Sequence, residues 1–314
     1  MENITPKVSI ILPVYFGEKS LENTLKSLLS QTYSNFELIA CIDGSNDNSE
    51  EILKSQNDER IQVLSNESNM GLGRTMNKLV YHSNPNSLYI AVAEQDDWYY
   101  PERLKMQVDY LEQHPDVGLV SGIAEHVSEG KRNYRFPHIL DRGDNYPDDS
   151  IEMFKLNFRE QIKVVNTCMM FRKEIHQNKG LYFTQHYPSL GIDWAYVLRF
   201  SLVSKIGGIA EPLVKIDRAV DRNSLTANKV KQFKASRELI RSFYWEFSNI
   251  LTDKDYKTAM NTQYLLEGLQ LNAFVGLKRI FQMLLNDAGD KRISELRASV
   301  TKRILRKIGL IKKQ

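Results

Sequence analysis

Short apolar runs alternate with segments of helical spacing between residues 8 and 123. Runs rich in β-branched residues predict buried strands, and apolar residues three or four positions apart predict amphipathic helices. The predicted strands cover residues 8–15, 36–42, 60–64, 88–93 and 117–123, and the predicted helices begin near Leu21, Glu50, Arg74 and Pro101. This alternation favours a largely parallel α/β sheet that is covered by helices on both faces.

The pattern becomes less regular in the second half. Residues 128–160 are polar and predict a long loop with a helix near 150–158, a candidate lid. Residues 164–172 read as a strand, 191–202 as a helix and 207–216 as a short edge strand. From about residue 230 the pattern is helical, with a stripe that predicts a buried face: Leu266, Leu269, Ala273, Leu277, Ile280 and Leu284. We expect an α/β domain over 1–228, with halves near 1–125 and 126–228, and a helical extension over 229–314.

Carboxylates follow the ends of two predicted strands. Asp43 comes directly after one, and Glu94, Asp96 and Asp97 follow another. Because ligands of parallel sheets bind at the carboxyl ends of strands, both groups should meet at one edge. Crowded carboxylates repel each other, so a cation should lie beside them. Oxygen ligands of this kind suit Mg²⁺ or Mn²⁺. A solvated acidic loop is the alternative for each group alone.

Composition narrows the class of protein. The chain has 314 residues, is 42% hydrophobic and contains two cysteines, Cys41 and Cys168, outside any CxxC pair. We therefore expect a globular protein of a reducing compartment, without a disulfide framework or structural zinc. The N-terminus lacks a basic leader, and no run approaches the roughly 18 apolar residues of a spanning helix.

The net charge of +3 hides a basic tail. Residues 291–314 carry nine Lys and Arg against one acid, so the other 290 residues sum to −5. An acidic body without a basic aromatic face argues against nucleic-acid binding. In the tail, apolar residues at helical spacing alternate with basic ones: Ile293, Leu296, Val300, Ile304 and Ile308. This predicts either a helix on an anionic membrane surface or a terminal helix packed on the protein.

Several ordered blocks resemble glycosyltransferase family 2, the inverting enzymes with the GT-A fold. The similar segments span about residues 6–226 and begin with the first strand and the segment Ser27 to Tyr33. They continue with Asp43 to Asp47, Asn69 to Leu72 with Asn77, Glu94 to Asp97, Pro101 to Leu104, and Gly191 to Asp193. Glu94 stands where Asp is common, and Ile192 stands where an acid often precedes the base. The resemblance implies a Rossmann-like GT-A sheet with helices.

The resemblance also implies roles for individual residues. A divalent cation, Mn²⁺ or Mg²⁺, would be bound directly by Asp97, with Asp96 binding through water or contacting the ribose, and Glu94 in support. The nucleotide would contact Pro13, Tyr15 and Asp43. Asp43 could instead cap a helix, and Arg74 either contacts the diphosphate or is a solvated helix residue.

Asp193 is the candidate general base, with a helix cap as its alternative role. His138 and His186 are other candidate bases, each isolated in a polar segment. Trp98, Tyr99 and Trp194 could stack on sugar rings or pack in the core.

The sequence thus predicts an inverting glycosyltransferase of the EC 2.4 type. It would move a sugar from a nucleotide donor, by family frequency a UDP-sugar, to a glycan or lipid-linked acceptor in surface polysaccharide synthesis. We expect a cytoplasmic enzyme, with residues 291–314 as a candidate contact to the inner face of the membrane. The alternatives are a non-catalytic nucleotide-sugar-binding module and a nucleotidyltransferase, although the first strand lacks a Gly-rich phosphate loop.

Overall fold

The computed structural model describes residues 8–127, 133–161, 164–184, 191–217 and 228–307. The Cα positions divide the chain into two compact units. The sheet unit comprises residues 1–154 and 163–222, and the helical unit comprises residues 155–162 and 223–314. None of the helices in the described ranges combines the length and hydropathy needed to cross a bilayer.

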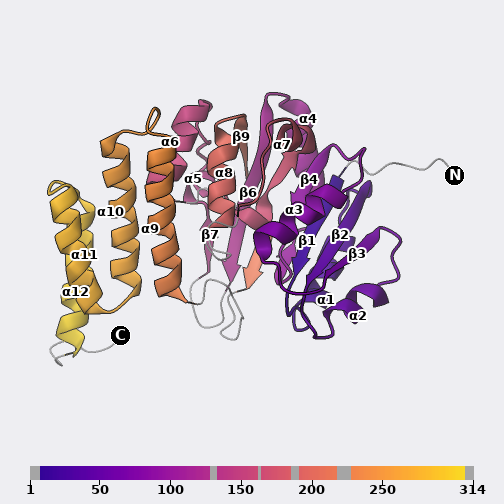
Figure 1. The fold of residues 1–314 in the computed structure, drawn as a ribbon, viewed down its shortest axis with the longest axis horizontal. Coiled ribbons are helices and arrows are strands. Elements are labelled where there is room, and N and C mark those ends of the chain that lie inside the picture. The colour runs from indigo at the N-terminus through magenta and orange to yellow at the C-terminus, as the bar shows by residue number, and fades with distance from the viewer. Residues whose placement is uncertain (1–7, 128–132, 162–163, 185–190, 218–227, 308–314) are drawn as a thin grey trace. The chain divides into compact units, whose positions relative to one another are not determined.

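The sheet unit begins with the predicted strand and helix alternation (Figure 1). Its first elements have these bounds: β1 Val8–Val14, α1 Leu21–Leu29, β2 Phe36–Asp43, α2 Ser49–Ser55, β3 Ile61–Asn66, α3 Leu72–His82, β4 Tyr89–Val92, β5 Asp97–Tyr99, α4 Arg103–Gln113 and β6 Val117–Val127. The predicted strands before residue 123 agree with β1, β2, β3, β4 and β6 within a few residues. Fully buried side chains on β1 and β2 explain why these segments read as strands.

The remaining elements of this unit differ more from the predictions. They are β7 Tyr134–Phe136, α5 His138–Asp141, α6 Ser150–Glu160, the 3-10 helix η1 Asn166–Cys168, β8 Met170–Arg172, α7 Lys173–Asn178, α8 Ile192–Ser201 and β9 Lys205–Asp217. The helix predicted near 150–158 is confirmed by α6. The long loop predicted before it is wrong in part, because β7 and α5 lie within it. The strand predicted for 164–172 is largely wrong, since only its last residues join the sheet.

The sheet is mixed but mostly parallel, with the order β3-β2-β1-β4-β8-β6-β9-β5 and β7 beside β6. Strands β3, β2, β1 and β4 run parallel, and so do β6 and β9, whereas β8 is antiparallel to both of its neighbours. The strand predicted at 207–216 is confirmed as part of β9, but the prediction that it is short and at an edge is wrong. Strand β9 has 13 residues and lies between β6 and β5.

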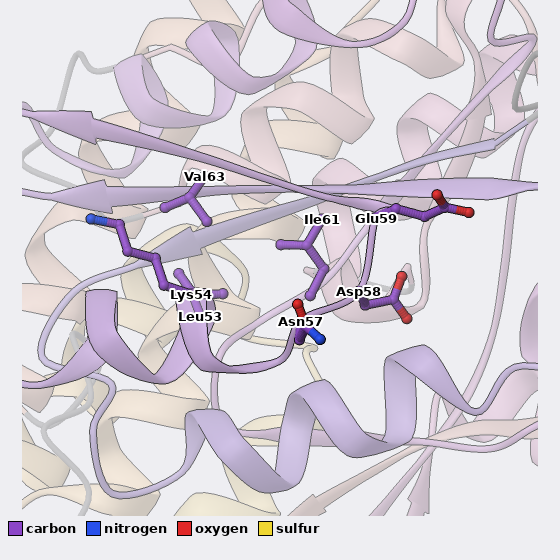
Figure 2. A pocket seen from close by; sticks show the side chains of 7 residues that line it. All are labelled: Leu53, Lys54, Asn57, Asp58, Glu59, Ile61 and Val63. Carbon is purple, nitrogen blue, oxygen red and sulfur yellow. The ribbon is translucent and has the colours of Figure 1, made fainter.

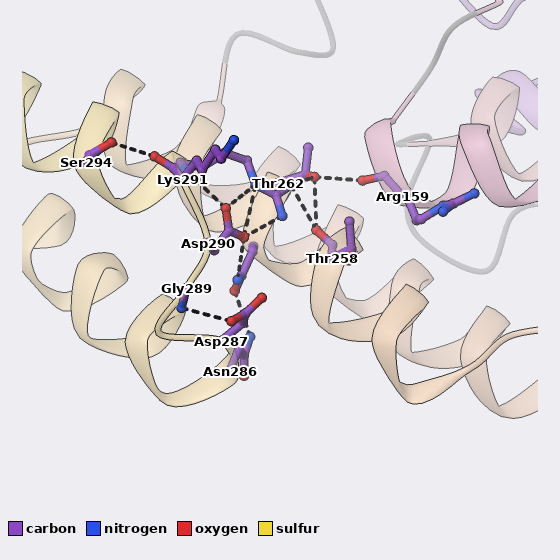
Figure 3. A network of polar contacts seen from close by, with 11 residues as sticks. Arg159, Thr258, Thr262, Asn286, Asp287, Gly289, Asp290, Lys291 and Ser294 are labelled. Carbon is purple, nitrogen blue, oxygen red and sulfur yellow. Dashed lines mark hydrogen bonds and ion pairs between the residues drawn. The ribbon is translucent and has the colours of Figure 1, made fainter.

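The helical unit contains the end of α6 and four further helices. They are α9 Lys229–Glu246, α10 Asp253–Gln270, α11 Ala273–Asn286 and α12 Arg292–Lys307. Polar contacts connect its helices (Figure 3): Thr262 Oγ1 donates to the Arg159 carbonyl over 2.7 Å, and Asn261 Nδ2 donates to Asp290 over 2.8 Å. A buried carboxylate, Glu267 on α10, pairs with Arg237 of α9 and Arg279 of α11.

Two predictions for this unit need correction. The apolar residues Ile293, Leu296 and Val300 of α12 are buried, because α12 packs on α10 and α11. They therefore do not form a free membrane-binding face, and the alternative of a terminal helix packed on the protein is confirmed for them. Ile304 is 36% exposed, and Ile308 lies outside the described residues. In α11, by contrast, Leu277 and Leu284 are 50% and 43% exposed, although the sequence predicts a buried stripe.

Candidate active site

The carboxyl ends of β2, β1 and β4 form one edge of the parallel half of the sheet. The register pairs Val14 of β1 with Ile42 of β2, and Ile11 of β1 with Val92 of β4. Asp43 ends β2, and Glu94 follows β4 closely. The predicted convergence of the two acidic groups on one edge is therefore confirmed by the topology.

Glu94, Asp96 and Asp97 form a compact carboxylate cluster. One ligand oxygen from each lies within 4.8 Å of the others, which fits a single cation with oxygen ligands. Asp97 is 3% exposed, whereas Glu94 and Asp96 are half-buried. The Glu94 carboxylate also accepts a hydrogen bond from Asn166 Nδ2 over 2.7 Å. The three acids can thus present oxygen to a divalent cation from a partly buried position.

The buried side chains of Tyr99 and Arg103 form a polar frame that packs beside this cluster. Tyr99 is fully buried, and its hydroxyl lies 2.6 Å from the Glu94 backbone nitrogen, which donates to it, and 2.6 Å from Thr167 Oγ1. The Arg103 guanidinium lies over the Tyr99 ring at 4.5 Å and donates to the Val92 carbonyl over 2.6 Å. Arg103 therefore supplies a buried positive charge that interacts with Asp97.

The electrostatics of this frame follow from burial. Burial lowers the pKa of Arg103 and raises the pKa of Tyr99 well above its ordinary value, and the Asp97 charge raises the Tyr99 pKa further. Burial also raises the pKa of the Cys168 thiol to about 12 and that of Cys41 to about 11. Both cysteines are free and stay protonated at neutral pH.

Helix α1 holds the acidic segment from the other side. Thr24, Ser27 and Gln31 are buried on one face of α1 or directly after it. Thr24 Oγ1 lies 2.9 Å from the Gln95 and Asp97 carbonyls, and Ser27 Oγ accepts from the Tyr99 backbone N–H over 3.1 Å. Gln31 donates to the Tyr100 carbonyl and accepts from the Leu104 N–H. Three buried polar residues at helical spacing are the sequence signal for this support.

Asp43 is buried and organises the neighbouring loop. Its carboxylate accepts hydrogen bonds from Asn66 Nδ2 and the Met70 N–H, both over 2.8 Å, and from the Gly71 N–H over 3.0 Å. The N-cap of α2 is Asn48, so the alternative of Asp43 as a helix cap is wrong. Gly44 has a φ of +71°, and a Cβ there would lie 2.3 Å from the Ser68 carbonyl carbon. The two turns therefore pack closely only because residue 44 is glycine.

The remaining candidate nucleotide contacts surround the same strand ends. Pro13 is half-buried in β1, and Tyr15 is 43% exposed just after it. Arg74 is exposed in the first turn of α3. On the same helix, Asn77 exchanges two hydrogen bonds of 2.9 and 2.8 Å with the backbone of Phe183. This contact fixes a segment that precedes α8 in the sequence.

Asp193 is the second residue of α8 and is half-buried. Burial raises its pKa above the ordinary value of 3.8, while hydrogen bonds from its own and the Trp194 backbone N–H groups partly offset this rise. The side chain thus contacts the first turn of its own helix, and a cap and a general base both remain compatible with this position. Of the alternative bases, His138 lies in α5, and His186 lies outside the described residues.

The candidate stacking residues differ in exposure. Trp98 is 39% exposed, whereas Tyr99 and Trp194 are buried. Only Trp98 can therefore offer a ring to a ligand in this conformation. A separate hollow of about 370 Å³ lies between α2 and β3 and is lined by none of the candidate residues (Figure 2).

The mixed sheet with a carboxylate cluster at the ends of its parallel strands defines a glycosyltransferase of the GT-A type. The family model Glycosyl transferase family 2 matches residues 9–179, and the chain belongs to this family. Its family relationship, predicted from the ordered motifs, is confirmed.

The relatives include WfgD of Escherichia coli, a UDP-Glc:alpha-D-GlcNAc-diphosphoundecaprenol beta-1,3-glucosyltransferase. It is 34% identical over 104 residues, which are 33% of this chain and 40% of WfgD. The chain likewise spans about 40% of the length of relatives from Bacillus subtilis and Methanocaldococcus jannaschii.

Solved structures share the fold at low sequence identity. S. aureus TarS 1–349 superposes with a TM-score of 0.64 at 16% identity, covering 98% of this chain and 93% of that fragment. The mannosyltransferase PcManGT from Pyrobaculum calidifontis, in complex with GDP-Man and Mn²⁺, gives a TM-score of 0.57 at 16% identity. That match covers 96% of this chain and 81% of PcManGT.

Proposed function

We propose that this protein is an inverting glycosyltransferase that transfers a sugar from a UDP-sugar to a hydroxyl of a glycan or lipid-linked acceptor in surface polysaccharide synthesis. The observation that carries the proposal is the cluster of Glu94, Asp96 and Asp97 at the carboxyl end of β4. The domain from 1 to 228 would carry the reaction, with donor binding by about 1–125 and acceptor binding by 126–228. Residues 229–314 would form the helical extension.

Asp97 would bind a divalent cation, Mn²⁺ or Mg²⁺, with Asp96 and Glu94 completing or supporting the site. Such a cation stabilises the charge that a nucleoside diphosphate gains as it leaves. The 4.8 Å spread of the ligand oxygens and the partial burial of the acids support this assignment. Asn166 keeps one Glu94 oxygen occupied, which favours a supporting role for Glu94.

The nucleotide would lie along the ends of β1 and β2. Asp43 already accepts three hydrogen bonds, and a carboxylate has about four acceptor sites, so one remains for an N–H of the base. Pro13 and Tyr15 would line the base or ribose, and Asp96 would accept from a ribose hydroxyl. The exposed Arg74 would reach the diphosphate, although a solvated role fits its exposure equally well.

Asp193 would act as the general base on the face of the sugar opposite the diphosphate. It would take the proton of the acceptor hydroxyl while the acceptor oxygen bonds to the anomeric carbon. The bond from that carbon to the diphosphate oxygen breaks, and its electron pair stays on the leaving nucleoside diphosphate. A pKa raised by burial makes the Asp193 carboxylate a stronger base than an exposed aspartate.

The lipid-linked acceptor is supported by the activity of the relative WfgD, a glucosyltransferase that acts on alpha-D-GlcNAc-diphosphoundecaprenol. An acceptor of this kind would place the enzyme in the cytoplasm at the inner face of the membrane. The alternatives are a binding module without catalysis and a nucleotidyltransferase.

The test is turnover of a panel of UDP-sugars by the full chain with Mn²⁺ or Mg²⁺, compared with its Asp193→Asn variant. We expect metal-dependent release of UDP that falls in the variant. Metal-dependent donor binding without turnover would favour the binding module, and release of pyrophosphate from a nucleoside triphosphate would favour the nucleotidyltransferase. Either result would overturn the proposal.

A further inference from the structure

Helix α11 exposes its most apolar face. Five large apolar side chains, spaced one, three or four positions apart, are 43–78% exposed: Phe274, Leu277, Phe281, Leu284 and Leu285. On a helix of 3.6 residues per turn these positions form one continuous stripe over three turns. We call these five residues the α11 stripe. A contiguous apolar surface of this kind is typical of an interaction site.

The opposite face of α11 fixes this orientation. Gly276, Arg279 and Met283 are buried, and they lie at about half a turn from the stripe. A Cβ at Gly276 would lie 2.4 Å from Val300 of α12, so the two helices approach closely there. Arg279 Nη2 lies 2.5 Å from the buried Glu267 carboxylate of α10. Rotating α11 to bury the stripe would break this ion pair and the close packing at Gly276. The contacts of the buried face therefore keep the stripe exposed.

The net charge of the sequence around α11 favours an anionic partner. Residues 223–314 carry 18 Lys and Arg against 8 Asp and Glu, a net charge of +10, so residues 1–222 sum to −7. Lys278 is exposed and lies next to one edge of the stripe on the helix surface. A second copy docked through this face would bring two strongly basic regions together. An anionic surface would instead attract them, and each Lys or Arg close to an anionic bilayer contributes favourably.

We propose that the α11 stripe docks on an anionic lipid surface, with its apolar side chains at the boundary between headgroups and acyl chains. This inference deepens the proposed function, because it gives the enzyme a surface by which to reach a lipid-linked acceptor. It moves the membrane contact from the apolar face of α12, which is buried, to α11. The basic residues of α12 would add long-range attraction.

The experiment measures co-sedimentation of the full chain with vesicles of phosphatidylcholine alone or mixed with phosphatidylglycerol. We expect binding to the mixed vesicles that weakens with salt, and a fall of at least about tenfold in the partition coefficient for Phe281→Glu with Leu285→Glu. Tyr81→Glu is the matched control, because Tyr81 is 84% exposed on α3 in the sheet unit. This control should bind like the unchanged protein.

Two further measurements separate the outcomes. The thermal midpoint of the double variant should be unchanged, since both side chains are exposed, and its UDP-sugar hydrolysis without vesicles should be unchanged too. Equal vesicle binding by the double variant and the unchanged protein would overturn the proposal, as would no binding by either. A concentration-dependent dimer that only the double variant loses would assign the stripe to a second copy. Loss of hydrolysis by every form would count against the proposed function alone.

Discussion

The side chain of Gln95 forms two hydrogen bonds with the backbone of Tyr15, 80 residues away in the sequence. Gln95 Oε1 accepts from the Tyr15 N–H over 2.7 Å, and Gln95 Nε2 donates to the Tyr15 carbonyl over 2.9 Å. One end of this contact lies within the carboxylate cluster, and the other lies at the end of β1. These hydrogen bonds thus link the proposed metal-binding segment to the proposed nucleotide-binding segment.

Replacing Gln95 should therefore affect donor binding. Gln95→Ala removes both hydrogen bonds, each with a net contribution of about 0.5–1.5 kcal/mol, so we expect donor affinity to fall by roughly tenfold. Titration calorimetry with UDP and Mn²⁺ measures this. Gln62→Ala on the exposed side of β3 is the control and should bind UDP normally. Unchanged affinity in Gln95→Ala would show that Tyr15 needs no such anchor.

Asp97→Asn should weaken metal-dependent nucleotide binding. Removing one of two or three charged oxygen ligands reduces the attraction for a hard cation. We expect the affinity for UDP to drop in the presence of Mn²⁺ and to stay similar in its absence, measured by calorimetry. Asp109→Asn, on an exposed residue of α4, provides the matched loss of charge. An equal affinity of Asp97→Asn and Asp109→Asn for Mn²⁺ and UDP would remove Asp97 from the metal site.

Asp193→Asn should reduce transfer by about 10²–10⁴-fold and leave donor affinity nearly intact, because a general base acts on the acceptor. Steady-state rates and calorimetry measure the two effects. Asp253→Asn is the control for a helix-terminal role, since Asp253 also lies in the first turn of a helix, α10. Near-normal turnover in Asp193→Asn would show that Asp193 is not the general base and only contacts the first turn of α8.

The pH dependence of Asp193 gives a second signature. Its folded pKa is raised by burial, so the folded state holds this proton more tightly than the unfolded chain does. The contribution to stability is therefore present at low pH and is lost as pH rises through the folded pKa. We expect Asp193→Asn to be at least as stable as the unchanged protein at pH 7, in urea unfolding.

Catalysis should respond to the same group in the opposite direction. Only the ionised carboxylate can accept the acceptor proton, so the transfer rate should fall as pH drops through the raised pKa. The acid limb of the rate profile should lie above the ordinary aspartate value of 3.8. A limb at or below that value would argue for a different base.

Arg103→Lys should destabilise the sheet unit although it keeps the charge. Lysine cannot reproduce the planar guanidinium that covers Tyr99 and donates to Val92 and Gln107. We expect a loss of about 2–4 kcal/mol in the free energy of unfolding, because buried acceptors lose their partner. The control Arg135→Lys concerns an exposed pair with Glu125 and should change the free energy of unfolding far less. Comparable losses in the two variants would contradict this role for Arg103.

Before residue 123 the sequence alone predicts every strand except β5, the four helices, and the convergence of Asp43 with the Glu94 group. Local pattern suffices there, because buried parallel strands are continuous apolar runs and their carboxyl ends meet at one edge. Ordered motifs added the family. The position of β9 in the sheet was not predicted correctly. Its glycines and Pro212 suggested an edge strand, although β9 pairs on both sides.

Three-dimensional packing determines which polar residues support the site and which apolar faces are buried. Gln95, Gln31 and Arg103 act through backbone groups distant in sequence, which no local spacing specifies. The faces of α11 and α12 have similar patterns, yet the α12 face is buried and the α11 stripe is exposed. The difference arises because Gly276 permits close packing by Val300 and Glu267 holds Arg279 on the inner side, and both are relations between helices.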